Sequence, residues 1–177
     1  ESFGEDPYLC SLMGQAMVRG YQGEALNDEN AIAACAKHFA GYGASESGRD
    51  YATTNIPENE LRNVYLRPFY AAHQAGVATF MTSFGDLNGV PATGNKWLLQ
   101  RVLRSEWQYK GMVVSDWDSV QQLSTHGFTE NDGQSAHAAI AAGIDMEMSS
   151  TTFRHHAAAL IGDGSIDMLK IDNAVRR

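Results

Sequence analysis

The sequence lacks the features that mark several large classes of protein. No apolar run approaches the roughly 20 residues that a membrane-spanning helix needs, and the N-terminal ESFGEDPY has no basic-then-apolar signal peptide. Lys and Arg number 13 against 21 Asp and Glu, which gives a net charge of −8, and they form no cluster that could neutralise phosphates. We therefore expect neither a membrane nor a nucleic acid as a partner.

Cysteine is scarce, and the usual nucleotide motifs are missing. Cys10 and Cys35 are the only two cysteines, and their apolar settings predict two buried free thiols rather than a disulfide or a metal pair. No GxGxxG or P-loop motif follows any of the apolar runs. The histidines of the C-terminal half lack the spacing of a zinc site. We expect no cofactor and no metal.

The remaining composition is that of an ordinary globular protein. The chain has 177 residues, of which 44% are hydrophobic and 19% are charged. That length is enough to bury one sizeable core. We expect a single domain over residues 1–177, without an internal repeat or a low-complexity linker.

Segments with strand-like and helix-like patterns alternate along the chain. The apolar runs predict strands over residues 32–39, 77–83, 111–117 and 143–148. Helices are predicted from Pro7, from Pro57 with a kink or split at Pro68, from Asn95 and from Gln134, and two more close the chain around a Gly-Asp-Gly turn. This alternation predicts an α/β fold with parallel strands, and periodicity alone does not separate a barrel from an open sheet.

Polar and charged side chains collect where the predicted strands end. In barrels and in open parallel sheets, this carboxyl edge is where functional sites are assembled. The residues concerned are Lys37 and His38, Ser83 and Asp86, Asp116 and Trp117, and Glu147 and Ser149.

Asp116 follows the buried run GMVVS and has two interpretations. A carboxylate that a rigid strand end holds in one direction can act as a nucleophile. A lone Asp in this place more often caps the helix that follows it. Lys37 and His38 likewise have two interpretations. They could belong to a functional site, or they could simply form a solvated strand end.

Two further pairs of residues invite a functional interpretation but are expected to be structural. Asp145 and Glu147 fall on one face of their predicted strand, where they would support the fold or bind loop backbone. Trp97 and Trp107 recur at helical spacing, which is typical of packing residues rather than sugar platforms.

Four long motifs, in this order, carry a resemblance to a known family. They are ESFGEDPYL, AACAKHFAGYGASESGRDYATTNIPENELRNVYLRPF, GVATFMTSFGDLNGVPATGNKWLL and LRSEWQYKGMVVSDWDSV. Together they resemble glycoside hydrolase family 3, in its β-glucosidase and β-xylosidase branch. The resemblance implies a TIM-type (β/α)₈ barrel, of which this chain would be the later β/α units only.

The resemblance also implies a reaction and a set of site residues. Members of this family are retaining, exo-acting β-glycosidases, and the aspartate of the SDW motif, here Asp116, would be the nucleophile that forms a covalent glycosyl intermediate. The partner would be a small-molecule or oligosaccharide β-glycoside. Substrate-binding positions carried over from the family are Lys37, His38, Trp117, Met81, Phe84, Arg49 and Asp50.

Some parts of the family pattern fall outside the 177 residues. A complete barrel takes about 250 residues, so we interpret the chain as an internal fragment of the N-terminal catalytic barrel. Upstream strands with two sugar-binding residues, and a downstream sandwich-like domain with the general acid/base, would be absent. By the same resemblance, the protein would be periplasmic or secreted.

Two details of the motifs bear on substrate and positioning. The chain has KHFAGYG where the N-acetylglucosaminidase branch has a KHFPGHG-type loop, which favours gluco- or xylo-configured substrates. Phe84 stands where some relatives carry a tyrosine.

Three alternatives to an active β-glucosidase remain. They are a catalytically silent fragment with weak sugar binding, a β-xylosidase, and a different barrel enzyme that acts on phosphorylated or carbonyl substrates. The missing phosphate loop disfavours the last of these.

Overall fold

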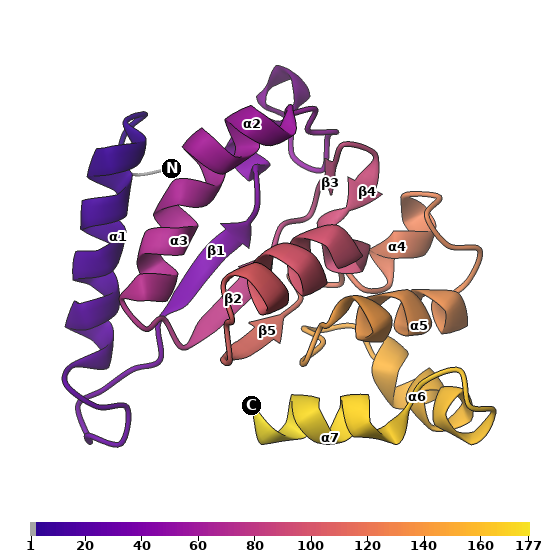
Figure 1. Cartoon of the computed structure of the whole chain (residues 1–177). Helices are drawn as coiled ribbons and strands as arrows, with labels where there is room; N and C mark the ends of the chain where they lie inside the picture. The colour runs from indigo at the N-terminus through magenta and orange to yellow at the C-terminus, as the bar shows by residue number, and fades with distance from the viewer. Residues whose placement is uncertain (1–2) are drawn as a thin grey trace.

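A parallel sheet of three short strands forms the centre of the protein. The computed structural model describes residues 3–177, with strands β1 (Cys35–Phe39), β2 (Thr79–Thr82) and β5 (Met112–Val114) in the order β1-β2-β5. Both strand pairs are parallel, as Figure 1 shows. The predicted α/β architecture, in its partial (β/α)₈ form, is confirmed, and each predicted strand is longer than the observed one.

The predicted fourth strand over residues 143–148 is reduced to a single bridge between Val114 and Met146. The backbone N–H groups of Asp145 and Met146 both donate to the carbonyl oxygen of Val113, at 2.8 and 3.2 Å. The Asp145 side chain meanwhile accepts a hydrogen bond from Val113 N at 2.8 Å. Because two consecutive N–H groups share one acceptor, the regular parallel ladder cannot continue there.

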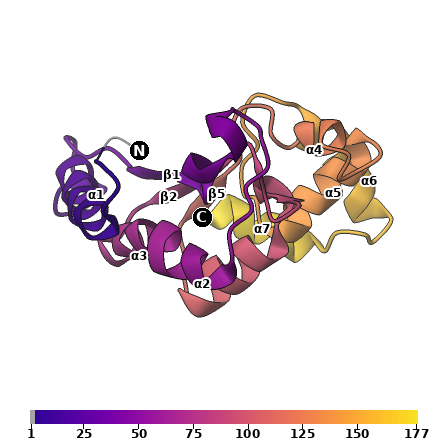
Figure 2. The same ribbon diagram turned by 90° about the horizontal axis from the view of Figure 1, so that it is seen from above.

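Helices follow the strands and cover the sheet (Figures 1 and 2). In both views α1 lies at one end of the molecule, beside α3, and α4, α5 and α6 lie at the other end. The α-helices are α1 (Pro7–Gln22), α2 (Glu58–Glu60), α3 (Leu66–Gln74), α4 (Gln122–Thr125), α5 (Asp132–Ala142), α6 (Thr152–Gly162) and α7 (Met168–Arg176). The π-helical segments are η3 (Leu61–Tyr65) and η5 (Trp97–Glu106).

The loops carry shorter elements. After β1 come two 3-10 turns, η1 (Tyr42–Ala44) and η2 (Glu46–Gly48). After β2 come a small hairpin of β3 (Asp86–Leu87) and β4 (Val90–Pro91), and then the 3-10 turn η4 (Ala92–Gly94). Thr54 and Asn88 join the two loops, since Asn88 N donates to Thr54 O at 2.8 Å.

Helix α1 begins and ends where its sequence indicates. The Asp6 side chain accepts hydrogen bonds from the backbone N–H groups of Tyr8 and Leu9, and Pro7 occupies the first turn, where its missing N–H has no cost. At the other end, Gly23 has a φ of 59°, a left-handed conformation that favours glycine. The predicted N-cap and first helix are confirmed.

Pro68 does not break the helix that contains it. Residues 58–74 are helical throughout, as α2, η3 and α3, with Pro68 in the first turn of α3. In place of the predicted kink or split, the helix changes from π-helical to α-helical after Tyr65, which is three residues before Pro68. A π-turn rearranges the hydrogen bonds where proline cannot donate one, so the chain continues without a sharp stop.

The core lies between the sheet and the helices that follow β1 and β2. Phe39 and Phe80 are fully buried, and their rings meet edge to face with centroids 5.2 Å apart. Trp107 contacts Phe39 edge to face at 5.8 Å, and both Trp97 and Trp107 pack against the core. The packing role predicted for these two tryptophans is confirmed.

The prediction of two buried thiols is wrong. Both cysteines are free, but Cys10 is only half-buried and Cys35 is exposed. Cys35 lies on β1, one of the two outer strands of the sheet, and no described strand pairs with the other edge of β1. Among residues 3–177, no helix is long and apolar enough to cross a membrane.

Candidate active site

The carboxyl ends of the three strands bring together residues that the sequence separates. His38 lies near the end of β1, Met81 is on β2, and Asp116 follows β5 by two residues. Because the strands are parallel, these ends share one edge of the sheet. The predicted gathering of polar side chains at this edge therefore includes His38 and Asp116, which face one another.

Asp116 is buried, with 6% of its surface exposed. Its Oδ1 accepts a hydrogen bond from the backbone N–H of Trp117 at 2.7 Å. Its Oδ2 is buried and has no hydrogen-bond partner within residues 3–177, although the Nε2 of His38 lies 3.4 Å away. A buried carboxylate oxygen without a hydrogen bond is costly, and such groups are uncommon outside functional sites.

The structure gives little support to Asp116 as a helix cap. Its carboxylate bonds only the next N–H in the chain, and it is the Asp116 carbonyl oxygen that accepts from Ser119 N at 3.1 Å. The first helix after it, α4, begins at Gln122 and has no side-chain cap. The other carboxylate oxygen, Oδ2, thus faces the His38 ring rather than a helix end.

His38 and Lys37 differ in how they are held. The His38 ring packs edge to face with Tyr42, with ring centroids 5.4 Å apart. Lys37 is exposed at the same strand end. Pairing of β1 with β2 is irregular between Ala36 and Phe39, so the simple alternation of an ideal strand does not apply to this Lys-His pair.

Apolar side chains border the same edge. Met81 is buried, whereas Trp117 is 60% exposed and offers a free aromatic face. The Phe84 ring lies 4.7 Å from Tyr51 and 6.2 Å from Tyr42, centroid to centroid. Tyr42 and Tyr51 were not among the residues that the sequence predicted to line the site. The one feature of the sequence that could have indicated them is that they are aromatic residues in a polar, glycine-rich loop.

Arg49 and Asp50 lie on that loop, and both are exposed. Within residues 3–177, the side chains of Arg49 and Asp50 have no hydrogen bond or ion pair. Backbone bonds fix the loop around them, from Arg49 N to Glu46 O at 3.2 Å and from Ala52 N to Arg49 O at 3.3 Å. The structure therefore holds the loop in place without bringing these two side chains against Asp116.

Asp145 and Glu147 have the structural roles expected of them. Asp145 pairs with Arg104 at 2.7 Å and with Arg177 at 2.6 Å. Glu147 accepts from the N–H groups of Thr152 and Phe153 at 3.0 and 2.7 Å, at the start of α6. Neither carboxylate is available as a second catalytic acid in this arrangement.

Burial shifts the pKa of several groups near the sheet. It raises the pKa of the Cys35 thiol, because neighbouring atoms partly enclose this group although the residue as a whole is exposed. A Thr79 hydrogen bond and the Lys37 charge lower the same pKa by less. Burial raises the pKa of the Tyr109 hydroxyl and lowers that of the Arg104 guanidinium, which Asp145 partly restores. No group of three or more His, Cys, Asp or Glu residues with metal-site geometry occurs in the described part of the chain.

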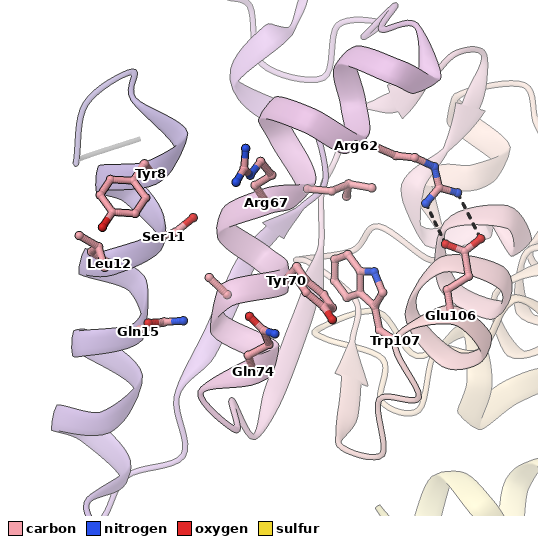
Figure 3. Close-up of a pocket in the computed structure, with 12 residues that line it drawn as sticks. Tyr8, Ser11, Leu12, Gln15, Arg62, Arg67, Tyr70, Gln74, Glu106 and Trp107 are labelled. Carbon is pink, nitrogen blue, oxygen red and sulfur yellow. Dashed lines mark hydrogen bonds and ion pairs between the residues drawn. The ribbon is translucent and has the colours of Figure 1, made fainter.

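Among the hollows of the described residues, two lie away from Asp116. A groove of about 570 Å³ runs over the outer helices, between α1, α3 and Trp107, and Figure 3 shows the Arg62 and Glu106 ion pair at its rim. A second hollow of about 310 Å³ lies against α7, near Asp145. The edge that carries Asp116 is therefore a separate surface.

Comparison with known proteins agrees with this architecture. The family described as "Glycosyl hydrolase family 3 N terminal domain" matches residues 1–177. A periplasmic beta-glucosidase of Salmonella typhimurium is 39% identical over 99% of this chain and 23% of its own length. A beta-xylosidase of Formosa agariphila is 45% identical over 84% of this chain and 21% of its own length.

Solved structures give the same result. The beta-glucosidase of Listeria innocua, crystallised in complex with glucose, has a TM-score of 0.95 and 44% identity over 97% of this chain and 24% of its own. The same enzyme has been solved with gluconolactone and with isofagomine. The chain spans about a quarter of the length of these relatives. It belongs to glycosyl hydrolase family 3, in the N-terminal domain of that family.

Proposed function

We propose that this chain forms the nucleophile-bearing part of a retaining, exo-acting β-glucosidase, in which Asp116 attacks the anomeric carbon of a terminal β-D-glucosyl residue. The observation that supports this most is the buried Oδ2 of Asp116, which has no hydrogen bond in the described chain and lies at the carboxyl edge of a parallel sheet. Sites of barrel enzymes are built at that edge.

The reaction follows from the geometry of retaining glycosidases. Asp116 Oδ2 forms a bond to the anomeric carbon while the bond from that carbon to the leaving oxygen breaks, and a general acid protonates the leaving oxygen. Water then attacks the anomeric carbon of the glycosyl-aspartate. The residue that served as the general acid in the first step now acts as a base and takes a proton from the water, and Asp116 is released. The two carboxyl groups stand about 5–5.5 Å apart in such enzymes, and we place the second one on polypeptide outside residues 1–177.

The neighbouring side chains suit the binding of a single sugar. The exposed face of Trp117 can cover the apolar C–H side of a pyranose. His38, 3.4 Å from Asp116 Oδ2, and the exposed Lys37 can bind hydroxyl groups close to the reacting carbon. Met81 and Phe84 supply apolar walls, and Arg49 and Asp50 belong to the loop above them. A periplasmic or secreted location is proposed on the name of the Salmonella relative.

A β-xylosidase is the second candidate, because relatives that carry this name are up to 45% identical to the chain. A glucoside differs from a xyloside by its C6 hydroxymethyl group. Comparing kcat/KM for 4-nitrophenyl β-glucoside and β-xyloside separates the two. A preference for the xyloside would overturn the glucosidase assignment while leaving Asp116 as the nucleophile.

The deciding experiment traps the intermediate. A complete enzyme, meaning a polypeptide of the relatives' length that contains residues 1–177, is incubated with a 2-fluoro β-glucoside that has a dinitrophenyl leaving group, which needs no acid. Peptide mapping should find one glycosyl group on the peptide containing Asp116, and none after Asp116→Asn substitution. Labelling of another residue would refute the nucleophile assignment. No turnover and no labelling of a folded enzyme would support a catalytically silent protein.

A further inference from the structure

A chain of buried hydroxyl groups runs from strand β2 to the turn that carries Asp116. Thr82 Oγ1 lies 2.9 Å from Thr93 Oγ1, and Thr93 Oγ1 lies 2.9 Å from Ser119 Oγ. Ser119 Oγ in turn donates to the backbone carbonyl oxygen of Asp116 at 3.0 Å. The three hydroxyl residues are almost fully buried, with 0%, 1% and 4% of their surface exposed in this order.

Counting protons fixes the direction of this chain. The carbonyl oxygen of Asp116 can only accept, so the single hydroxyl proton of Ser119 is used there. The contact between Thr93 and Ser119 is then a hydrogen bond only if Thr93 donates. Thr93 therefore has no proton left for Thr82, and Thr82 must donate to Thr93. All three bonds exist together only when each hydroxyl donates toward Asp116.

The chain ends on a turn that is both crowded and strained. The Asp116 carbonyl oxygen accepts from Ser119 N at 3.1 Å, from Ser119 Oγ at 3.0 Å and from Ser115 Oγ at 3.1 Å. Inside the turn, Asp118 has a φ of 56°, a left-handed conformation that is uncommon for a residue other than glycine. Such a conformation persists where surrounding bonds determine it.

We propose that Thr82, Thr93 and Ser119 are positioning residues that hold the Asp116 turn, residues 116–119, so that the carboxylate is aimed at the anomeric carbon. This inference rests on the proposed function, since it concerns the same nucleophile. The hydroxyl chain ties the turn after β5 to η4 and to the end of β2, which are buried parts of the sheet edge. Near-attack geometry is demanding, and a shift of about 1 Å can cost roughly 100-fold in rate.

The test measures how fast Asp116 becomes glycosylated in the complete enzyme. Ser119→Ala and Thr93→Val remove one hydroxyl each, and Val is close to Thr in shape, so the packing is kept. We expect the first-order labelling rate constant to fall about tenfold for either variant, with the dissociation constant of the reagent changed less than twofold. Thr93→Ser, which restores the hydroxyl, should recover most of the rate.

The design separates positioning from general stability. Ser135→Ala is the matched control and should label at the parent rate, because Ser135 is also fully buried but its hydroxyl bonds Thr129 and the Asn131 carbonyl oxygen rather than the Asp116 turn. The rate constant is a property of the folded molecules and does not depend on the fraction of the sample that is folded. The amplitude of labelling reports that fraction. The double variant Thr93→Val with Ser119→Ala should lose about as much as Ser119→Ala alone, since both act through one chain.

Each outcome decides something. Labelling of Thr93→Val and Ser119→Ala at the parent rate, with Asp116 still the labelled residue, would refute the positioning role and leave the proposed function standing. If Thr93→Val does not fold, Thr82→Val provides the same comparison at the start of the chain. Absence of labelling at Asp116 in the unsubstituted enzyme would refute the proposed function and this inference with it.

Discussion

The Nε2 atom of His38 lies 3.4 Å from the Oδ2 atom of Asp116, although His38 is on β1 and Asp116 follows β5, and these two strands do not pair with each other. Strand β2 separates them in the sheet, and Met81 is the residue of β2 that pairs with Val114 of β5. Both side chains reach the same point beyond the ends of the strands. The sheet thus presents a carboxylate and an imidazole to one small volume.

This contact leads to a prediction for His38. In the complete enzyme, His38→Ala should lower kcat/KM for an aryl β-glucoside by about 10- to 100-fold, because it removes a hydrogen-bonding group beside a charged nucleophile. Steady-state kinetics measure the change. His155→Ala, an exposed histidine on α6, is the control and should leave the kinetics unchanged. An effect below about threefold would mean that His38 does not act on the reacting sugar.

The nucleophile assignment predicts a sharp contrast between two neighbouring aspartates. Asp116→Asn should lower kcat by at least about a thousandfold, because the amide cannot form the glycosyl ester. Asp118→Asn keeps a side chain that tolerates the left-handed backbone at that position and should stay within about threefold of the parent. Equal losses in the two variants would point to damage of the turn rather than loss of the nucleophile.

Phe84 offers a test of how the nucleophile is held. Its ring packs against Tyr51 and Tyr42, so Phe84→Tyr adds a hydroxyl without removing these contacts. We expect kcat/KM of the complete enzyme to stay within about tenfold of the parent, or 1.4 kcal/mol. A much larger gain in rate would show that a missing hydroxyl at this position limits the enzyme.

Asp145 is predicted to matter for stability rather than for chemistry. Its side chain is 2% exposed and lies between Arg104 and Arg177. Asp145→Asn leaves the buried Arg104 without its partner and should lower the free energy of unfolding by roughly 3 kcal/mol. Urea denaturation of the complete enzyme measures this loss. The exposed pair of Glu58 and Arg62 provides the control, because Glu58→Gln should cost less than about 1 kcal/mol.

Cys35 should react slowly with alkylating agents at neutral pH. Burial raises the pKa of its thiol, so the reactive thiolate is scarcer below that pKa than for an ordinary cysteine. The alkylation rate should rise with pH, about tenfold per unit, until the raised pKa is reached. Mass spectrometry of the iodoacetamide-treated enzyme, with Cys35→Ser to identify the peptide, measures this. A rate that levels off below pH 8 would contradict the raised pKa.

Much of the fold could be predicted from local patterns. The cap of α1 at Asp6, the alternation of strands and helices, and the two closing helices depend on neighbours in the chain, and the structure has them. The predicted fourth strand does not form because the Asp145 side chain accepts the Val113 N–H that a ladder would pair with a backbone carbonyl, and two N–H groups share the Val113 carbonyl oxygen. Such competition arises only when distant segments meet.

The candidate site, like the fold, could be predicted from the sequence only in part. The sequence by itself determined the family, through motifs such as KHF and SDW, and with it the identity of the residues to examine. Only the tertiary structure decided that His38 faces Asp116, that Arg49 and Asp50 stay apart from it, and that Thr82, Thr93 and Ser119 form one chain of hydroxyls. The physical reason is that these contacts depend on strand order, register and turn geometry, which position side chains across the sheet edge and leave no periodic mark in the sequence.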